Sequence, residues 1–457
     1  MKKTLLLLSL LLLMLAGCTS FNNEDVSPMK SSSGDENLDR ILINLLEEHS
    51  GGIGPEYFIL PESFELKKIP QDPNNQVIAE KVELGRLLFH DAGLATNSKF
   101  EMFKNTYSCA TCHHFQAGFQ AGRAQGIAEG GVGFGRIGEI RDKDEMCPED
   151  SLDIQPIRSP ATLNSAYQKV MLCNGQFGAT GPNTGTENRW TPGTPLEINF
   201  LGFEGIETQA IAAMTVHRMG IPVELIEHTE YKDMFDAAFP DFPENERYTK
   251  ITAGLAMAAY ERTILASEAP FQRYLRGNPN TLTREQKKGA ILFFGKANCV
   301  SCHTGPALNS MSFHAYGMND LEGYGVYGPD PDEPTKKGRG GFTGNEADNC
   351  KFKTPQLYNL HEARFLGHGS SFSNIEEVIR YKNRGIKEND FVPDSHLAEA
   401  FVPLGLSERE IIQLTNFIEF GLYDANLSRY EPSYVPSGSC IPNNDEASRL
   451  DLGCILP

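Results

Sequence analysis

Positive charge, tryptophan and long apolar runs are all scarce in this chain of 457 residues. Lys and Arg number 41 against 60 Asp and Glu, so the formal net charge is −19. This balance argues against a nucleic-acid binder, because phosphate recognition needs a basic face. Ten cysteines are too few for a disulfide scaffold at this length, although they are enough for metal or cofactor sites. The hydrophobic share of 40% is that of an ordinary globular protein.

The first residues have the pattern of a bacterial export signal. Two lysines precede an apolar run over residues 5–15, which is too short to span a bilayer. The run ends in Leu15-Ala16-Gly17-Cys18, which resembles a lipobox, where the cysteine is lipidated and becomes the first mature residue. We therefore predict a lipoprotein signal peptide over residues 1–17, lipidation of Cys18 and a flexible tether over residues 18–36. The protein would face the periplasm, held to a membrane by lipid alone.

Apolar residues at helical spacing predict a mainly α protein with long loops, because the alternation typical of strands is scarce. The predicted helices span residues 38–46, 77–89, 205–219, 222–238, 249–266, 283–294, 375–384 and 407–420. Eight glycines lie between residues 118 and 138, without the Gly-Lys-Ser/Thr ending of a phosphate loop. We interpret this segment as a loop whose backbone passes close to a bulky group.

Two pentapeptides carry the chemistry: Cys109-Ala110-Thr111-Cys112-His113 and Cys299-Val300-Ser301-Cys302-His303. Cys-x-x-Cys-His is the attachment signature of c-type haem. The two thiols reach the two vinyl groups of the porphyrin, and the adjacent histidine ligates the iron. Zinc is the alternative, but nothing else in the chain is spaced like a zinc module. We predict two covalently bound haem c groups, with His113 and His303 as iron ligands.

The spacing of the two motifs predicts two tandem cytochrome c-like domains. A predicted helix precedes each motif, and the distance between the motifs is enough for one haem domain each. We place the amino-terminal haem domain at residues 37–270 and the carboxy-terminal one at residues 271–430. Residues 431–457 are predicted to be a loop-like tail.

From about residue 75 to residue 425 the sequence resembles the bacterial di-haem cytochrome c peroxidases and their MauG-like relatives. Beyond the haem motifs, the resemblance rests on Arg158-Ser159-Pro160-Ala161-Thr162-Leu163-Asn164, Gln209-Ala210, Lys353-Thr354-Pro355-Gln356-Leu357-Tyr358-Asn359, Gly367-His368-Gly369 and Ile375-Glu376-Glu377-Val378-Ile379. It implies an amino-terminal haem that reacts with hydrogen peroxide and a carboxy-terminal haem that takes in electrons. It also implies a small electron-donor protein of the cytochrome c or cupredoxin type.

The resemblance assigns roles residue by residue. His113 would be the proximal ligand of the peroxidatic haem, and His303 that of the electron-transfer haem. The family also binds a calcium ion between its domains. Asn164 matches the calcium-binding asparagine, and the backbone carbonyls would fall at Ala363 and Phe365.

The predicted peroxide site departs from the family pattern. The family uses a Gln and, about ten residues later, a Glu to move the proton. Gln209 fits the first position, whereas the second falls in a stretch without an acid. His217 is the candidate acid/base there, with Arg218 stabilising the leaving hydroxide. The alternative is that His217 lies on a helix face and binds a haem propionate. Glu207 and Glu204 are the alternative acids.

Two other family features are missing. The Gly-rich loop has no histidine to block the peroxidatic iron, so we expect an open or water-bound sixth position. Glu129 in that loop is expected to face solvent or a propionate. The family's inter-haem tryptophan is also absent, because the corresponding run is Cys173-Asn174-Gly175-Gln176. Trp190 either substitutes for it or simply packs.

The sixth ligand of the carboxy-terminal haem is usually methionine. Ungapped counting from His368 places Lys382 at the position of that methionine. Tyr381, next to it, and Met318 are the other candidates. The sequence does not choose among these three. Of the remaining cysteines, Cys440–Cys454 is the pair we expect to be bonded, and Cys147–Cys173 is the second pair considered.

Three functions follow as hypotheses. The first is a di-haem peroxidase that reduces hydrogen peroxide with electrons passed from the carboxy-terminal to the amino-terminal haem. The second is a MauG-like oxidase of a protein or organic partner. The third is a di-haem electron carrier without peroxide chemistry. The oligomeric state is left open, with a homodimer as one candidate.

Overall fold

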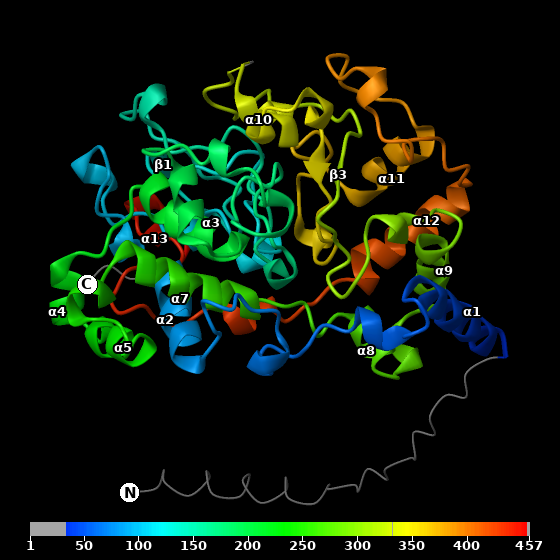
Figure 1. Cartoon of the computed structure of the whole chain (residues 1–457), viewed down its shortest axis with the longest axis horizontal. Coiled ribbons are helices and arrows are strands. Elements are labelled where there is room, and N and C mark those ends of the chain that lie inside the picture. Colours follow the sequence, from blue (N-terminus) through cyan, green and yellow to red (C-terminus); the bar gives the residue numbers. More distant parts are fainter. Residues whose placement is uncertain (1–32, 331, 455–457) are drawn as a thin grey trace, which may run out of the picture.

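The computed structural model describes residues 33–330 and 332–454, so the predicted signal peptide, Cys18 and most of the tether lie outside the described residues. The fold is mainly α, as predicted (Figure 1). The helices are α1 (Ser33–His49), α2 (Ala79–His90), α3 (Gly205–Val216), α4 (Val223–His228), α5 (Tyr231–Ala238), α6 (Glu244–Arg247), α7 (Lys250–Thr263), α8 (Pro270–Leu275), α9 (Arg284–Phe294), α10 (Arg339–Thr343), α11 (Ile375–Arg384), α12 (Glu408–Asn416) and α13 (Glu446–Asp451). Two antiparallel pairs join β1 (Gly131–Val132) to β2 (Asp142–Lys143) and β3 (Phe313–His314) to β4 (Phe352–Lys353). Over the described ranges, no helix has the length and apolar character needed to cross a membrane.

Helices α2, α3 and α7 frame the amino-terminal half, and glycine lets them approach closely. A Cβ atom on Gly85 of α2 would lie 2.0 Å from the Ala256 carbonyl oxygen of α7. A Cβ atom on Gly254 of α7 would lie 2.6 Å from the Cα atom of Ile211 in α3. Neither position has room for a larger residue, so α7 is held against both neighbours.

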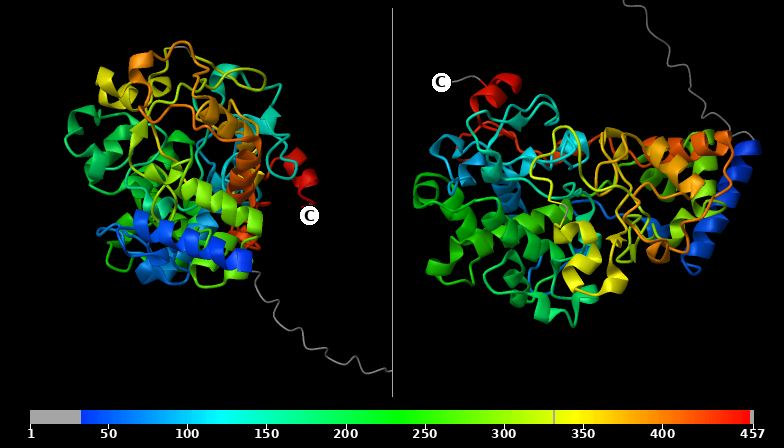
Figure 2. Two further views of the ribbon diagram at one scale, coloured as in Figure 1. Left: turned by 90° about the vertical axis from the view of Figure 1, so that its right-hand side faces the viewer. Right: turned by 90° about the horizontal axis from the view of Figure 1, so that it is seen from above.

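The carboxy-terminal half is framed by α9 and α12, with α1 across α9 (Figures 1 and 2). Gly289 of α9 faces the Gln413 carbonyl oxygen of α12, which would lie 2.1 Å from an added Cβ. Asp39 of α1 lies 2.7 Å from Lys287 Nζ of α9 and accepts a hydrogen bond from Tyr274 OH of α8 over 3.0 Å. The start of the predicted amino-terminal domain therefore packs on the helices of the other half.

The predicted helix over residues 222–238 is wrong in one respect, because it forms two helices, α4 and α5. Thr229 lies at the break. Its hydroxyl donates to the Leu225 carbonyl over 2.6 Å and accepts from the Tyr231 backbone N–H over 3.2 Å. A threonine side chain that bonds the backbone in this way competes with helix continuation.

The carboxy-terminal tail, residues 431–454, fastens the Gly-rich loop. The predicted Cys440–Cys454 disulfide is confirmed, whereas Cys147 and Cys173 are free thiols in separate surroundings. Within the tail, Asp445 pairs with the buried Arg141 over 3.1 Å. The first residues after β1 are held as well, because Asp451 Oδ2 accepts the backbone N–H groups of Phe134 and Gly135 over 2.9 and 3.0 Å.

We predict that Asp445→Ala strongly destabilises the protein, because the Arg141 guanidinium, 2% exposed, loses its only ion-pair partner among the described residues. Breaking a buried pair on one side costs about 3–5 kcal/mol. Denaturant titration of the purified full chain measures the change. Glu408→Ala, which removes an exposed partner of Arg380, is the control and costs less than about 1 kcal/mol. Equal losses in the two variants would contradict the role given to the tail.

Candidate functional site

The first cavity, of about 350 Å³, lies between the first Cys-x-x-Cys-His turn and the helices α3 and α7. Cys109, Cys112 and His113 all line it, and both cysteines are free thiols. His113 Nδ1 donates to the Phe119 carbonyl oxygen over 3.3 Å, which leaves Nε2 for a metal. Burial lowers the pKa of His113 to about 4, so the imidazole is neutral, as ligation requires. These residues fit a covalently attached haem.

His217 follows α3 directly and lines the same cavity. Its Nδ1 lies 3.0 Å from Asp153 Oδ2, so Nε2 is the nitrogen left for a bound molecule. Tyr107 OH donates to the His217 carbonyl oxygen over 2.9 Å and fixes the backbone. Burial alone lowers the pKa of His217, but the Asp153 carboxylate outweighs burial, and the net shift is upward. Such a pair can hold and release a proton.

Gln209 of α3 and Glu261 of α7 add two unpartnered polar atoms to this cavity. Gln209 Oε1 and Glu261 Oε2 are buried and have no hydrogen-bond partner among the described residues. Burial, together with the nearby Glu207 carboxylate, raises the pKa of Glu261 to about 8. Glu261 is therefore mostly protonated at neutral pH. Sequence reasoning missed both Glu261 and Asp153, although a charged residue in the Ala-rich segment of α7 is a usable signal.

Glu207 lies outside the lining of the first cavity and is fully buried. Both of its oxygens accept from Arg262, with Nε at 2.8 Å and the second nitrogen at 2.7 Å. Glu204 also accepts from Arg262, over 3.2 Å. The two-point pair engages both oxygens of Glu207, so neither is free to act on a molecule in the first cavity. Both alternative acids, Glu207 and Glu204, are therefore bound by Arg262 of α7.

Arg218 and Glu129 differ from expectation, because they pair with each other. Glu129 is fully buried, accepts the Phe100 backbone N–H over 3.0 Å, and is hydrogen-bonded by the Arg218 guanidinium. Neither residue lines the first cavity. The expectation that Glu129 faces solvent is therefore wrong, and the pair fixes the Gly-rich loop to the end of α3.

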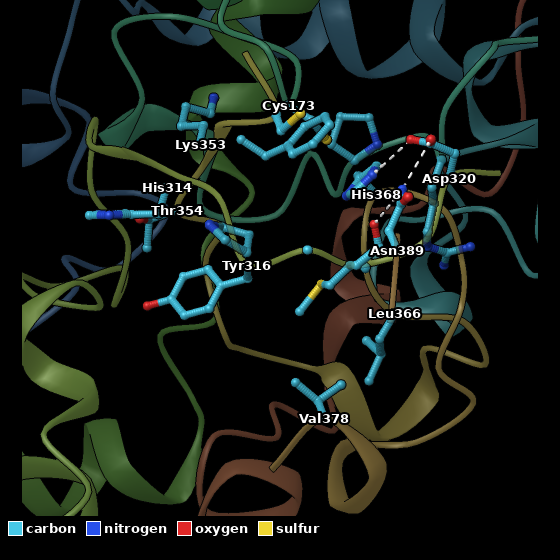
Figure 3. A pocket seen from close by; sticks show the side chains of 18 of the residues that line it. Cys173, His314, Tyr316, Asp320, Lys353, Thr354, Leu366, His368, Val378 and Asn389 are labelled. Carbon is cyan, nitrogen blue, oxygen red and sulfur yellow. Dashed lines mark hydrogen bonds and ion pairs between the residues drawn. The ribbon is translucent and has the colours of Figure 1, made fainter. Parts of the chain in front are cut away.

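The second cavity has a volume of about 660 Å³, and the other haem motif contributes to its lining. Figure 3 shows part of the wall of this cavity. Cys302 and His303 line it, and Cys299 begins the same turn. His303 Nδ1 lies 3.1 Å from the Leu308 carbonyl oxygen and 3.0 Å from that of Pro355, so its Nε2 is again left for a metal. Burial lowers the pKa of His303 to about 4. The residues present therefore fit a second haem c.

Three more histidines line the second cavity. His314 and His368 already have polar partners, whereas His396 Nδ1 is buried without a hydrogen-bond partner among the described residues. His368 stacks on Phe352 with ring centroids 3.7 Å apart, and its Nε2 lies 3.3 Å from Asp320 Oδ1. His314 Nε2 lies 2.8 Å from Ser312 Oγ. Figure 3 shows His314 and the His368–Asp320 pair at separate places on the wall.

The three predicted sixth ligands of the second haem are placed differently. Met318 and Lys382 line the second cavity, whereas Tyr381 does not. The Tyr381 hydroxyl donates to the Tyr316 carbonyl oxygen over 2.5 Å. Lys382 Nζ lies over the Tyr316 ring and makes no hydrogen bond or ion pair within the described part of the chain. Burial lowers the pKa of Lys382 to about 7, although the two haem-motif thiols oppose the shift.

The two cavities have four lining residues in common, Arg158, Ser159, Pro160 and Leu172, which we name the shared wall. Trp190 is not among the residues lining either cavity. It packs edge-on against Phe200 with ring centroids 5.2 Å apart, and its indole N–H donates to Thr186 Oγ1 over 3.2 Å. Trp190 thus has a packing role in this fold.

Asn164, the predicted calcium ligand, is fully buried. Its Oδ1 accepts the Ala266 backbone N–H over 3.0 Å, and its Nδ2 lies 3.5 Å from Gln356 Oε1. The described residues contain no cluster of three or more Asp, Glu, His or Cys side chains suited to a metal ion. Both polar atoms of the Asn164 side chain thus have a protein partner, and calcium binding stays a prediction of the resemblance.

Comparison with known proteins agrees with this geometry. The model of the family described as di-haem cytochrome c peroxidase matches residues 79–280. Methylamine utilization protein MauG of Methylorubrum extorquens is 27% identical over 369 residues, which are 79% of this chain and 82% of that protein. Cytochrome c peroxidase Ccp of Escherichia coli is 27% identical over 332 residues, 72% of this chain and 57% of that protein. A solved MauG-like protein associated with microbial copper homeostasis has the same fold, with a TM-score of 0.54 and 23% identity over 80% of this chain and 94% of that one.

Proposed function

Because the chain belongs to the di-haem cytochrome c peroxidase and MauG family, we propose that it reduces hydrogen peroxide to water with electrons from a small redox protein. One peroxide, two electrons and two protons yield two waters. A haem iron bound at His113 would supply the electron transfer that breaks the O–O bond. The observation that carries the proposal is the first cavity, where His113, His217 and Glu261 line one space.

His217 is the proposed acid/base of this reaction. Its free Nε2 takes a proton from one oxygen of the bound peroxide and returns it to the other oxygen, which leaves as water. Asp153 keeps Nδ1 occupied over 3.0 Å and stabilises the imidazolium that forms between these two steps. Arg218 takes no part, because its guanidinium is held by Glu129.

Gln209 and Glu261 complete the proton arrangement. The unpartnered Gln209 Oε1 can accept a hydrogen bond from a bound peroxide or water, and it therefore orients that molecule. The protonated Glu261 supplies one of the two protons that the reaction consumes, and solvent restores it. The first cavity thus holds a base and a proton store on different helices.

Electrons are proposed to enter at the haem of His303 and to cross the shared wall to the haem of His113. We further propose Lys382 as the sixth ligand of the His303 haem. Its amine lines the second cavity without a hydrogen bond, and its low pKa makes the neutral form available near pH 7. Nitrogen ligation gives a lower reduction potential than a methionine thioether.

A MauG-like oxidase is the second candidate, and one observation favours it. The histidine-free Gly-rich loop contributes Gly126 and Ala128 to the first cavity, so it places no imidazole in front of the iron. An open ferric site could react with peroxide without prior reduction, and the two electrons that peroxide takes would then be withdrawn from a partner. A simple electron carrier is the third candidate.

The remaining expectations belong to this proposal as well. We propose that the chain is exported, that lipid on Cys18 holds it on the periplasmic side of a membrane, and that a cytochrome c or cupredoxin donates the electrons. The sequence pattern of residues 1–18 supports the first two. The acidic net charge of −19 favours a donor with a basic docking face.

Stopped-flow absorbance tests the proposed function directly. The all-ferric and the half-reduced di-haem protein are each mixed with one equivalent of hydrogen peroxide. We expect the half-reduced form to react rapidly. Because it supplies only one of the two electrons that peroxide takes, its product returns to the all-ferric state only after one further electron from a reduced donor. A fast reaction of the ferric form that leaves a long-lived oxidised species would favour the oxidase, and no reaction of either form would leave the electron carrier.

Replacement of His217 tests the acid/base assignment. We expect His217→Gln to slow peroxide cleavage about 10²- to 10⁴-fold, the usual contribution of a general base, with both haem spectra unchanged. The exposed His228, at the end of α4, provides the matched control His228→Gln, which keeps the wild-type rate. A wild-type rate in His217→Gln would remove His217 from the mechanism.

The pH dependence of peroxide cleavage tests whether His217 itself is the group that takes the proton. Asp153 raises the pKa of His217, so Asp153→Asn lowers it. The neutral imidazole that accepts the proton then persists to lower pH, and the acid limb of the rate profile moves to lower pH. An acid limb that stays in place would mean that another group sets it.

Replacement of Lys382 tests the sixth ligand. We expect Lys382→Ala to convert the haem of His303 from low-spin to high-spin, measured by absorbance and electron paramagnetic resonance. Lys382→Met keeps it low-spin and raises its reduction potential, because thioether favours the reduced iron. Met318→Ala leaves the wild-type spectrum. A high-spin signal in Met318→Ala alone would assign the ligand to methionine.

A further inference from the structure

Arg158 carries a buried positive charge that no carboxylate neutralises. The side chain is 4% exposed and makes no ion pair with any residue that the structure describes. Its nitrogens donate only to neutral groups, namely the carbonyl oxygens of Arg123 over 2.9 Å and Ala121 over 3.2 Å, and the Gln120 side chain over 3.3 Å. Its Nε is buried without a partner. Burial lowers the pKa of Arg158 to about 10, so the guanidinium is still charged at neutral pH.

The charge of Arg158 lies where the two cavities meet. Arg158 belongs to the shared wall and is the one Arg or Lys that lines the first cavity within the described ranges. Asp153, Glu261 and Glu333 line the same cavity, and none of them pairs with it. The Arg158 backbone N–H donates to the His368 carbonyl oxygen over 2.9 Å, which ties the residue to the second cavity as well.

An isolated buried guanidinium is costly, and it calls for an anion with planar oxygens. Haem brings two carboxylates into each cavity. We propose that Arg158 binds a haem carboxylate through its free Nε–H edge and sets a fixed positive charge between the two haems. The proposal rests on the two-haem assignment and not on peroxide turnover. A positive charge at this place favours the electron that arrives on the first haem, because it stabilises the reduced form.

Redox titration tests this proposal without any turnover. The midpoint potential of each haem is measured by spectroelectrochemistry from pH 6 to pH 9 in the full-length di-haem protein. At the alkaline end, where the haem carboxylate is ionised, Arg158→Gln is expected to lower the reduction equilibrium constant of the first haem about tenfold, which is about 59 mV for one electron. Unchanged potentials across the whole series would overturn the proposal.

Two further variants separate charge from structure. Arg158→Lys keeps the charge but cannot reproduce every hydrogen bond to residues 120–123, so its potential stays near wild type if the charge matters. Arg339→Gln is the matched control, because Arg339 is 5% exposed, donates to the carbonyl oxygens of Gly175 and Pro182, and lines neither cavity. A shift in Arg158→Lys as large as that in Arg158→Gln, or an equal shift in Arg339→Gln, would show a structural effect and overturn the proposal.

Discussion

Close helix contact through glycine is the interaction on which the rest of this structure depends. Gly85 and Gly254 bring α2 and α3 against α7, and Gly289 does the same for α9 and α12. These contacts use little side-chain volume, so each half is a thin helical frame. The wide space beside each frame is then walled by loops, and that space is where the Cys-x-x-Cys-His turns lie. The long loops of this chain are therefore part of the haem sites.

The partners of a buried charged residue decide whether it holds the structure together or is available for chemistry. Arg262 holds Glu207 in a two-point pair, and Arg218 holds Glu129, so these four residues fix helices and loops. Glu261 lies next to Arg262 in sequence yet keeps a free oxygen in the first cavity. Glutamate thus fixes helices at one position and, in the proposed mechanism, stores a proton at another, and the difference lies in whether a guanidinium bonds to it.

Sequence reasoning identified what is local and missed what is assembled from distant segments. The haem motifs, the helical pattern and the Cys440–Cys454 pair were all predictable, because neighbouring residues carry the signal. The Asp153 carboxylate lies 64 positions from His217 and Glu129 lies 89 positions from Arg218, so only the fold shows these pairs. The Cys147–Cys173 pair was wrong because thiol count says nothing about distance. The break at Thr229 reflects a side chain that competes with its own helix.

The tail that fastens the Gly-rich loop also imposes an order on biosynthesis. Arg141 and its partner Asp445 are 304 positions apart, so most of the chain must be made before they can meet. The helices α2, α3 and α7 are therefore complete long before Asp445 secures the Gly-rich loop. Until the tail docks, the first haem turn lacks the hydrogen bonds that Ser108 and Thr111 make to Pro442 and Asn443, so the turn is less enclosed than in the finished fold.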